Sequence, residues 1–175
     1  MTEELQAFLL ERAQHYFREV RGFKYDEVNA VLAGGWRSVS NLLRKLIALS
    51  RVRKSKDFEP LAASFRRIKN ILKQADFEPQ GRISQALLEP GPELELFEAY
   101  ESAKKVADSA GSDFEEALSA IASIRPQVDA FFEKVLVNVA DSEIRTNRLT
   151  LLYFLLGEFS TIADFSEIVT LGDTK

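Results

Sequence analysis

The chain of 175 residues contains no cysteine, one histidine and one tryptophan. The absence of cysteine excludes disulfide bridges, thiolate nucleophiles and zinc–sulfur sites. The single histidine, His15, has no acid–base or metal-ligand companion at a suitable spacing, so we expect a solvated or half-buried side chain there. A composition without cysteine is compatible with the reducing cytoplasm, where we expect this protein to reside.

Long apolar runs and enzyme motifs are also missing. No run approaches the roughly 18 residues of a membrane span, and Glu3, Glu4 and Glu11 stand where a signal peptide would be basic or apolar. No Gly-x-x-x-x-Gly-Lys phosphate loop, Gly-x-Ser-x-Gly elbow or His-Glu-x-x-His pair occurs. We therefore expect no catalytic residue, no metal site and no cofactor in this segment, and no membrane partner.

Apolar residues recur at helical spacing along the chain, and no window alternates as a strand would. The pattern predicts an all-α bundle of about seven or eight helices. Ser112 and Glu115 have the spacing of a capping box, Pro126 suits a first helical turn, and Asp141 is expected to cap the last helix. Between Pro126 and Asp141, the spacing predicts one buried helical stripe formed by Val128, Phe131, Phe132, Val135, Leu136 and Val139.

Charge is divided unevenly along the chain, whose net charge is −4. Residues 1–75 hold 15 lysines and arginines against 8 acidic residues, whereas residues 76–175 hold 8 against 19. Most of the positive excess lies between Arg37 and Lys73. Such asymmetry is typical of a protein that binds a polyanion on one face. The alternatives are a solvated basic face, or a basic face that pairs with the acidic half of the chain or with another subunit.

The predicted helix from Pro60 to about Lys73 sharpens this expectation. On a helical wheel its cations and Asn70 share one side, Arg67 lies on the flank, and the apolar residues point the opposite way. Phosphate contacts of this kind supply affinity without sequence information. The predicted RNA-contacting residues are Arg51, Arg53, Lys54, Lys56, Arg66, Arg67, Lys69, Asn70 and Lys73.

Arg145 and Arg148 fall inside an apolar stripe of the last predicted helix, and a buried cation needs a partner. They either grip an RNA backbone or bridge to Asp129, Glu133 or Asp141 across the helical turn, and their position favours the bridge. Asn147, off that stripe, either caps or contacts RNA.

Trp36 follows Gly34-Gly35, and we expect it to anchor a loop in the core rather than to stack on a nucleobase. Phe131 and Phe132 are likewise assigned to the core rather than to base stacking.

The segment from Ile124 to Leu152 reads IRPQVDAFFEKVLVNVADSEIRTNRLTLL. Shorter motifs accompany it in the order Phe23–Asp26, Ala30–Ala33, Arg67–Leu72 and Ile162–Ser166. Together these residues resemble the C-terminal part of the beta subunit of bacterial heterotetrameric glycyl-tRNA synthetase. The resemblance is loose between about residues 74 and 110. Asn138 and Ala140 depart from the pattern.

The resemblance implies a helical DALR-type anticodon-binding domain, of which Glu116-Ala117-Leu118 with Arg125 is a degenerate echo. The resemblance implies three partners: tRNA(Gly), the alpha subunit and the remainder of the beta subunit. It implies no binding of DNA. ATP and Mg are implied for the whole enzyme, whose alpha subunit handles glycine and ATP. We expect residues 1–35 to continue from the rest of the beta subunit, residues 36–170 to form the domain, and residues 171–175 to be a flexible tail. The alternative is a structural or docking domain.

Overall fold

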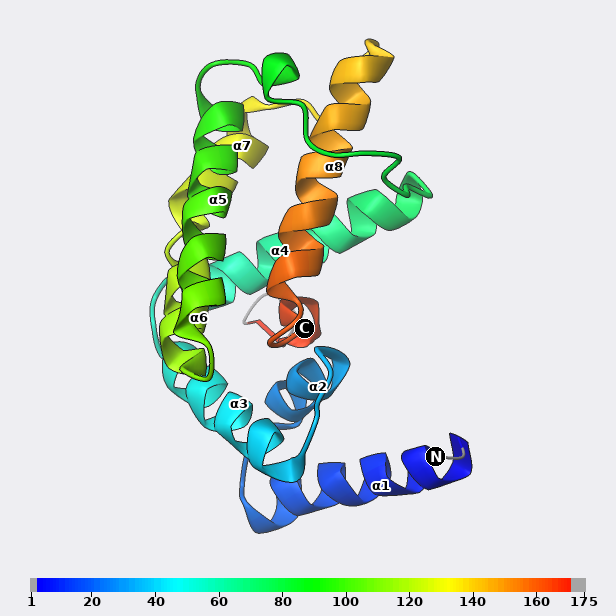
Figure 1. The fold of residues 1–175 in the computed structure, drawn as a ribbon, viewed down its shortest axis with the longest axis vertical. Coiled ribbons are helices and arrows are strands. Elements are labelled where there is room, and N and C mark those ends of the chain that lie inside the picture. Colours follow the sequence, from blue (N-terminus) through cyan, green and yellow to red (C-terminus); the bar gives the residue numbers. More distant parts are fainter. Residues whose placement is uncertain (1–2, 171–175) are drawn as a thin grey trace.

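The computed structural model describes the backbone of residues 3–170 and the side chains of residues 8–170. The predicted tail at 171–175 lies outside the described residues. Figure 1 shows an assembly of helices, and the described residues form no strand, which confirms the all-α prediction. Short η segments of other helical types lie between or beside the α-helices. The elements are α1 (Glu3–His15), η1 (Tyr16–Val20), α2 (Tyr25–Ala33), α3 (Val39–Val52), α4 (Phe58–Gln74), η2 (Gln85–Leu87), α5 (Pro92–Ala110), α6 (Phe114–Ala122), α7 (Arg125–Lys134), α8 (Ser142–Phe159) and η3 (Phe165–Glu167).

Two of the predicted helix starts are confirmed and one is wrong. Asp141 caps α8, since its Oδ1 accepts from the amides of residues 143 and 144 at 2.9 and 3.1 Å, and Pro126 lies in the first turn of α7. The cap of α6 is Asp113 rather than Ser112, because the Asp113 carboxylate accepts from the Glu116 amide at 3.1 Å. A carboxylate at the N-cap also interacts favourably with the positive end of the helix dipole.

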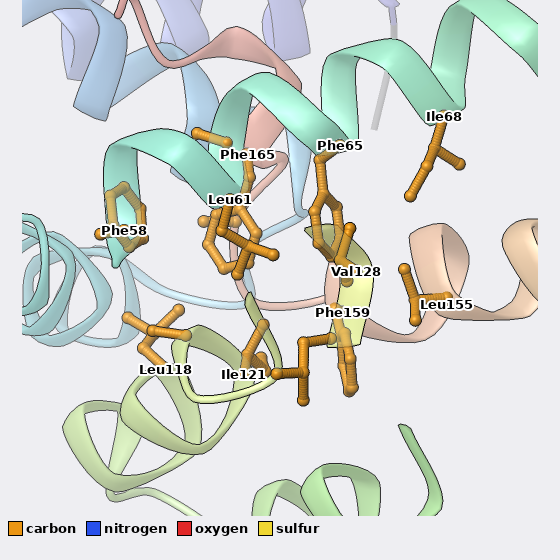
Figure 2. Close-up of a cluster of buried hydrophobic side chains, with 14 of the residues drawn as sticks. Phe58, Leu61, Phe65, Ile68, Leu118, Ile121, Val128, Leu155, Phe159 and Phe165 are labelled. Atoms are coloured by element: carbon orange, nitrogen blue, oxygen red, sulfur yellow. The ribbon is translucent and has the colours of Figure 1, made fainter. Parts of the chain in front are cut away.

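The central core lies between α4 and the three helices α6, α7 and α8 (Figure 2). Figure 2 shows Phe58, Leu61, Phe65 and Ile68 of α4 turned toward side chains of α6, α7 and α8. Phe165, after α8, packs between two of these rings, with ring centroids 5.2 Å from Phe58 and 5.3 Å from Phe65. The post-α8 segment, defined as residues 163–169, therefore belongs to the core of the molecule.

The predicted stripe of α7 is interrupted. Val128 and Phe131 are fully buried, but the helix ends at Lys134 and Val135 is already extended. Leu136, assigned to the stripe, is 68% exposed. The β-branched residues at 135, 137 and 139 favour extended backbone, so the apolar spacing continues past the point where the helix stops.

The N-terminal segment protrudes from the rest of the molecule, as Figure 1 shows for α1 at the lower edge. Phe17 is buried, whereas other large apolar side chains of α1 and η1 are substantially exposed, namely Phe8, Leu9, Leu10, Tyr16 and Val20. By contrast, α2 packs on α3 and η3. Within residues 3–170, the helices are too short or too polar to cross a membrane.

Candidate nucleic-acid interface

The corner between α3 and α4 carries four of the predicted RNA-contacting cations. Lys54 and Lys56 are exposed in the turn. The side chain of Arg51 is 63% exposed, and its Nη1 lies 2.8 Å from Oε2 of Glu115, which is 48% exposed. An ion pair between exposed residues contributes at most about 1 kcal/mol. Arg51 can therefore exchange Glu115 for a phosphate at small cost.

Arg53, at the same corner, lies inside the fold with 9% of its side chain exposed. Its Nη1 is 2.8 Å from Oδ1 of Asp26 and 3.4 Å from Oε1 of Glu27, and its Nη2 donates to the carbonyl of Val169 at 3.1 Å. Burial raises the pKa of Asp26, but hydrogen bonds from Arg53 and from the Val169 amide outweigh this and leave that pKa below its ordinary value. Arg53 therefore holds α2 and the post-α8 segment against α3.

Arg66 and Lys69 of α4 also serve the post-α8 segment. The Lys69 ammonium lies 3.0 Å from Oδ2 of Asp164 and 2.9 Å from Oγ of Ser166, and Arg66 donates to the carbonyls of Ser166 and Ile168. Desolvation lowers the pKa of Lys69, but the hydrogen bonds and charges of Asp164 and Glu167 together outweigh it, so the net shift is upward. The partners of Arg66 and Lys69 thus lie in the C-terminal half of the chain, as one of the alternatives predicted from the charge distribution expects.

Arg67, Asn70 and Lys73 are exposed residues of α4 for which no ion pair within the described residues is found. The Arg67 guanidinium carbon lies 4.2 Å from the ring centroid of Phe132 on α7. A guanidinium stacked on an aromatic face keeps its N–H edge free to contact a phosphate or a base. Phe132, predicted to be in the core, is only half-buried. The prediction missed this stacked pair because it depends on the approach of two helices distant in sequence.

Arg67 and Phe132 line a groove of about 940 Å³ between α4, the end of α7 and the start of α8. Its lining combines apolar surface with amide, hydroxyl and guanidinium groups, contributed among others by Ile71, Gln74, Phe77, Asn138, Arg145, Thr146 and Leu149. Apolar walls with a few directed polar groups suit a planar, polar-edged ligand such as a nucleobase.

Arg148 is 3% exposed, and its partners differ from those predicted. It pairs with Glu93 at 2.9 Å and with Glu89 at 2.8 Å, and donates to the carbonyl of Leu136 at 2.9 Å. The expected bridge to Asp129, Glu133 or Asp141 is wrong, because the guanidinium of Arg148 instead contacts Glu89, Glu93 at the start of α5 and the carbonyl of Leu136. Its role in the structure is to join α5 to α8.

The neighbours of Arg148 also have internal partners. Asn147, predicted to lie off the stripe, is 5% exposed and binds both the amide and the carbonyl of Ser84 through its carboxamide, at 2.7 and 3.0 Å. Arg145 donates to the carbonyl of Val139 at 2.8 Å while lining the groove. Asp129 is paired with Arg125 at 3.0 Å, one helical turn away.

The described residues contain no group of three or more acidic, histidine or cysteine side chains placed to hold a metal ion.

Comparison with known proteins identifies relatives of this chain. Residues 61–158 match the DALR anticodon binding domain. The chain is 46% identical over 176 aligned residues to the glycine–tRNA ligase beta subunit of Acidobacterium capsulatum, which covers 95% of this chain and 25% of that protein. It is 35% identical to that of Desulfatibacillum aliphaticivorans, over 95% of this chain and 24% of that protein. It is 38% identical to the beta subunit of Neisseria gonorrhoeae, over 86% of this chain and 22% of that protein. The chain thus spans about a quarter of the length of the first two relatives.

Proposed function

Since the match covers residues 61–158, more than half of the chain, this chain belongs to the DALR anticodon-binding domain family, and we propose that it binds the anticodon arm of tRNA(Gly). In this proposal it forms the C-terminal part of a cytoplasmic glycine–tRNA ligase beta subunit. By holding the anticodon arm it positions the acceptor end at the alpha subunit, where glycine and ATP react, and so supports glycyl-tRNA formation during translation. Residues 36–170 are proposed to be the RNA-binding domain, and residues 1–35 to connect it to the rest of the beta subunit.

The observation that carries the proposal is the groove beside the Arg67–Phe132 stack. Exposed polar residues of α4, Asn70 and Lys73, belong to the same helix. Lys54 and Lys56 precede that helix. RNA loops are recognised by stacking of splayed bases on aromatic or guanidinium planes, with cations holding the backbone. Because the chain as a whole is negative, we expect RNA to bind only where such cations gather.

The proposed RNA contacts are therefore narrower than the set expected from sequence. Arg51, Lys54, Lys56, Arg67, Asn70 and Lys73 are retained. Arg145, for which RNA contact was one of two alternatives, is included because it lines the groove. Arg53, Arg66 and Lys69 are proposed to act indirectly, by fixing the post-α8 segment against α3 and α4.

A titration of the chain with tRNA(Gly) and with a non-cognate tRNA, at two ionic strengths, tests the proposal. We expect tighter binding of tRNA(Gly) and a steep fall in affinity with salt, because each neutralised phosphate releases counterions. The triple variant Lys54→Gln, Arg67→Gln, Lys73→Gln should bind more weakly and show a shallower salt dependence. The control Arg21→Gln, Arg82→Gln, Lys105→Gln removes the same charge from exposed positions elsewhere and should retain the wild-type slope. Equal slopes for both triples would contradict this interface.

A second function, docking against other parts of the synthetase, is favoured by the exposed apolar surface of α1 and η1. Phe8 is 50% exposed and Val20 is 64% exposed, and apolar side chains gathered on a protruding helix typically mark an interaction surface. Crosslinking in the assembled enzyme separates the two functions. Links from residues 8–20 to protein support docking, and links from residues 51–73 to RNA support tRNA binding.

A further inference from the structure

A second cavity, of about 760 Å³, is lined by the loop before α3, the start of α3, the end of α5, α6 and the end of α8. It is separate from the groove beside Phe132 and shares no lining residue with it. The side chains that give it chemical character are two aromatic rings, one carboxamide and three cations: Trp36, Phe114, Asn41, Arg37, Arg44 and Lys45.

The cavity carries a local excess of positive charge in a chain that is negative overall. Lys104 also lines it, but this ammonium is held by Glu158 at 2.6 Å and faces Asp108 at 3.8 Å. Among the described side chains, no carboxylate pairs with Arg37, Arg44 or Lys45. Burial lowers the pKa of Lys45, and the neighbouring charge of Arg37 lowers it further. A bound anion would relieve this repulsion.

Two of these cations lie against an aromatic ring. The guanidinium carbon of Arg44 is 5.8 Å from the ring centroid of Phe114, and the ammonium of Lys45 is 5.7 Å from it. Trp36 is half-buried beside them. Aromatic faces next to cations bind the π-face of a nucleobase and the phosphate attached to it. The Asn41 carboxamide offers both a donor and an acceptor to the edge of a base.

The wall that carries Trp36 is held in place by backbone contacts. Lys45, 7% exposed, donates to the carbonyls of Gly35 and Thr161, both at 2.9 Å. Gly34 lies so close to residues 160–163 that a Cβ would be 2.8 Å from the carbonyl oxygen of Ser160. The loop 34–36 is thus pinned to the end of α8, and a preorganised wall lowers the entropy cost of binding.

A row of cations leads from the cavity to the corner of α3 and α4. Arg44 and Arg51 are seven residues apart on α3, about two turns, so both lie on the side of α3 that faces α6. Lys54 and Lys56 follow in the next turn. An RNA strand bound at that corner can therefore continue along α3 to the cavity.

We propose that this cavity receives a single unpaired nucleotide of the tRNA anticodon loop, with its base against Trp36 and Phe114 and its phosphate at Arg37 and Arg44. The inference rests on the proposed function, because it adds a base-binding site to the same RNA-binding domain. In this proposal Arg37 and Arg44 contribute to the affinity for RNA and Asn41 to the choice of base, although the charge pattern of α4 does not identify any of the three.

Trp36 is the one tryptophan of the chain, so its fluorescence reports on this cavity alone. We would titrate the full chain with an anticodon-arm hairpin of tRNA(Gly), and follow total binding by the anisotropy of labelled RNA and cavity occupancy by Trp36 emission. A second hairpin with abasic loop units keeps the phosphates and removes the bases. A third titration uses a free mononucleotide.

The inference expects Trp36 emission to be quenched along the same curve as the anisotropy. The abasic hairpin should bind at least about fivefold more weakly and leave the emission unchanged, because base–aromatic stacking is lost. Arg37→Gln with Arg44→Gln should weaken binding about tenfold. The control pair Arg21→Gln with Arg82→Gln, which removes the same charge outside the cavity, should bind as the wild type does.

The outcomes separate this inference from the proposed function. If the hairpin binds by anisotropy while Trp36 emission and the Arg37/Arg44 variant stay unchanged, the cavity is not a base site and tRNA binding still stands. If the mononucleotide quenches Trp36 but the hairpin does not, the cavity serves a free nucleotide and the inference fails. If no hairpin or intact tRNA binds at all, both fail.

Discussion

Arg148 and Glu93 form a buried ion pair in which Nε and Nη2 of the arginine lie 3.0 and 2.9 Å from a single glutamate oxygen, Oε2. The other oxygen of Glu93 has no partner among the described residues. The remaining guanidinium nitrogen donates to the carbonyl of Leu136. One side chain of α8 thus ties down both α5 and the extended segment after α7.

Arg148→Met should destabilise the protein strongly, because Glu93 is 1% exposed and would be left as an uncompensated buried charge. We expect the free energy of unfolding to fall by about 3–5 kcal/mol, measured by urea denaturation. Adding Glu93→Leu should recover most of the loss, since an apolar pair of similar volume replaces the ion pair. A double variant no more stable than Arg148→Met would contradict this account.

Stability should decrease in acid through Asp26 and Asp164. Burial raises the pKa of each carboxyl. For Asp26 this is outweighed by the hydrogen bond and charge of Arg53 and by hydrogen bonds from backbone amides, including that of Val169, and for Asp164 by the hydrogen bond and charge of Lys69 and by hydrogen bonds from Ser166. The net shift of each pKa is therefore downward from 3.8. Carboxyls with lowered pKa in the folded state stabilise the fold above their unfolded pKa and lose that contribution as the pH falls through the folded value.

Urea denaturation at a series of pH values measures this loss. We expect little change of the unfolding free energy from these two groups near neutral pH and a decline below pH 3.8. Asp26→Asn with Asp164→Asn should be less stable at pH 7 and should decline less steeply in acid. An acid slope identical to that of the wild type would show that other groups control acid unfolding.

Gly34→Ala should be destabilising, whereas Gly157→Ala should not. A Cβ at residue 34 would lie 2.8 Å from the Ser160 oxygen and 2.9 Å from the Ala163 nitrogen, which are backbone atoms and cannot rotate away. Overpacking of this kind costs about 1–3 kcal/mol. Gly157 lies inside α8 with nothing within 4 Å of its Cβ position, so alanine there should add about 1 kcal/mol through helix propensity. Thermal unfolding of both variants gives the comparison.

Asn147→Ala should loosen the segment before α5 without unfolding the helices. The variant leaves the amide and carbonyl of Ser84 without their partner, at a cost of about 1–3 kcal/mol for buried groups. Hydrogen exchange should show faster exchange of the Ser84 amide and its neighbours, while amides within α4 keep their protection. Unchanged exchange at residue 84 would show that the Asn147 carboxamide does not protect this amide.

The sequence predicted what depends on residues near one another in the chain. Asp141 and Pro126 were recognisable as helix-start residues because capping and the first-turn preference of proline act within a few residues. The apolar spacing of α4 predicted its buried side, with Leu61, Phe65 and Ile68 inward. The same spacing failed after Lys134, where alternate β-branched residues extend the backbone while keeping an apolar pattern.

What could not be predicted depends on which surfaces meet. Nothing local indicates that Arg148 finds Glu93, 55 residues earlier, or that Lys69 finds Asp164, 95 residues later. The surroundings of Trp36 also depend on which surfaces meet in the fold. It was assigned to the core by its type, and it does pack partly against the core, but it also lines a cavity together with Arg44 and Lys45 of the helix that follows.

The post-α8 segment has a consequence for how the polypeptide is made. Asp164 donates its amide to the Ala30 carbonyl at 2.8 Å, and Val169 donates to Asp26, 143 residues away. A nascent polypeptide leaving the ribosome therefore exposes α2 and the rings of Phe58 and Phe65 long before their covering residues have been translated. Phe165 can cover these rings only after α1 to α8 have been synthesised, so this flank of the core stays open to solvent during that time.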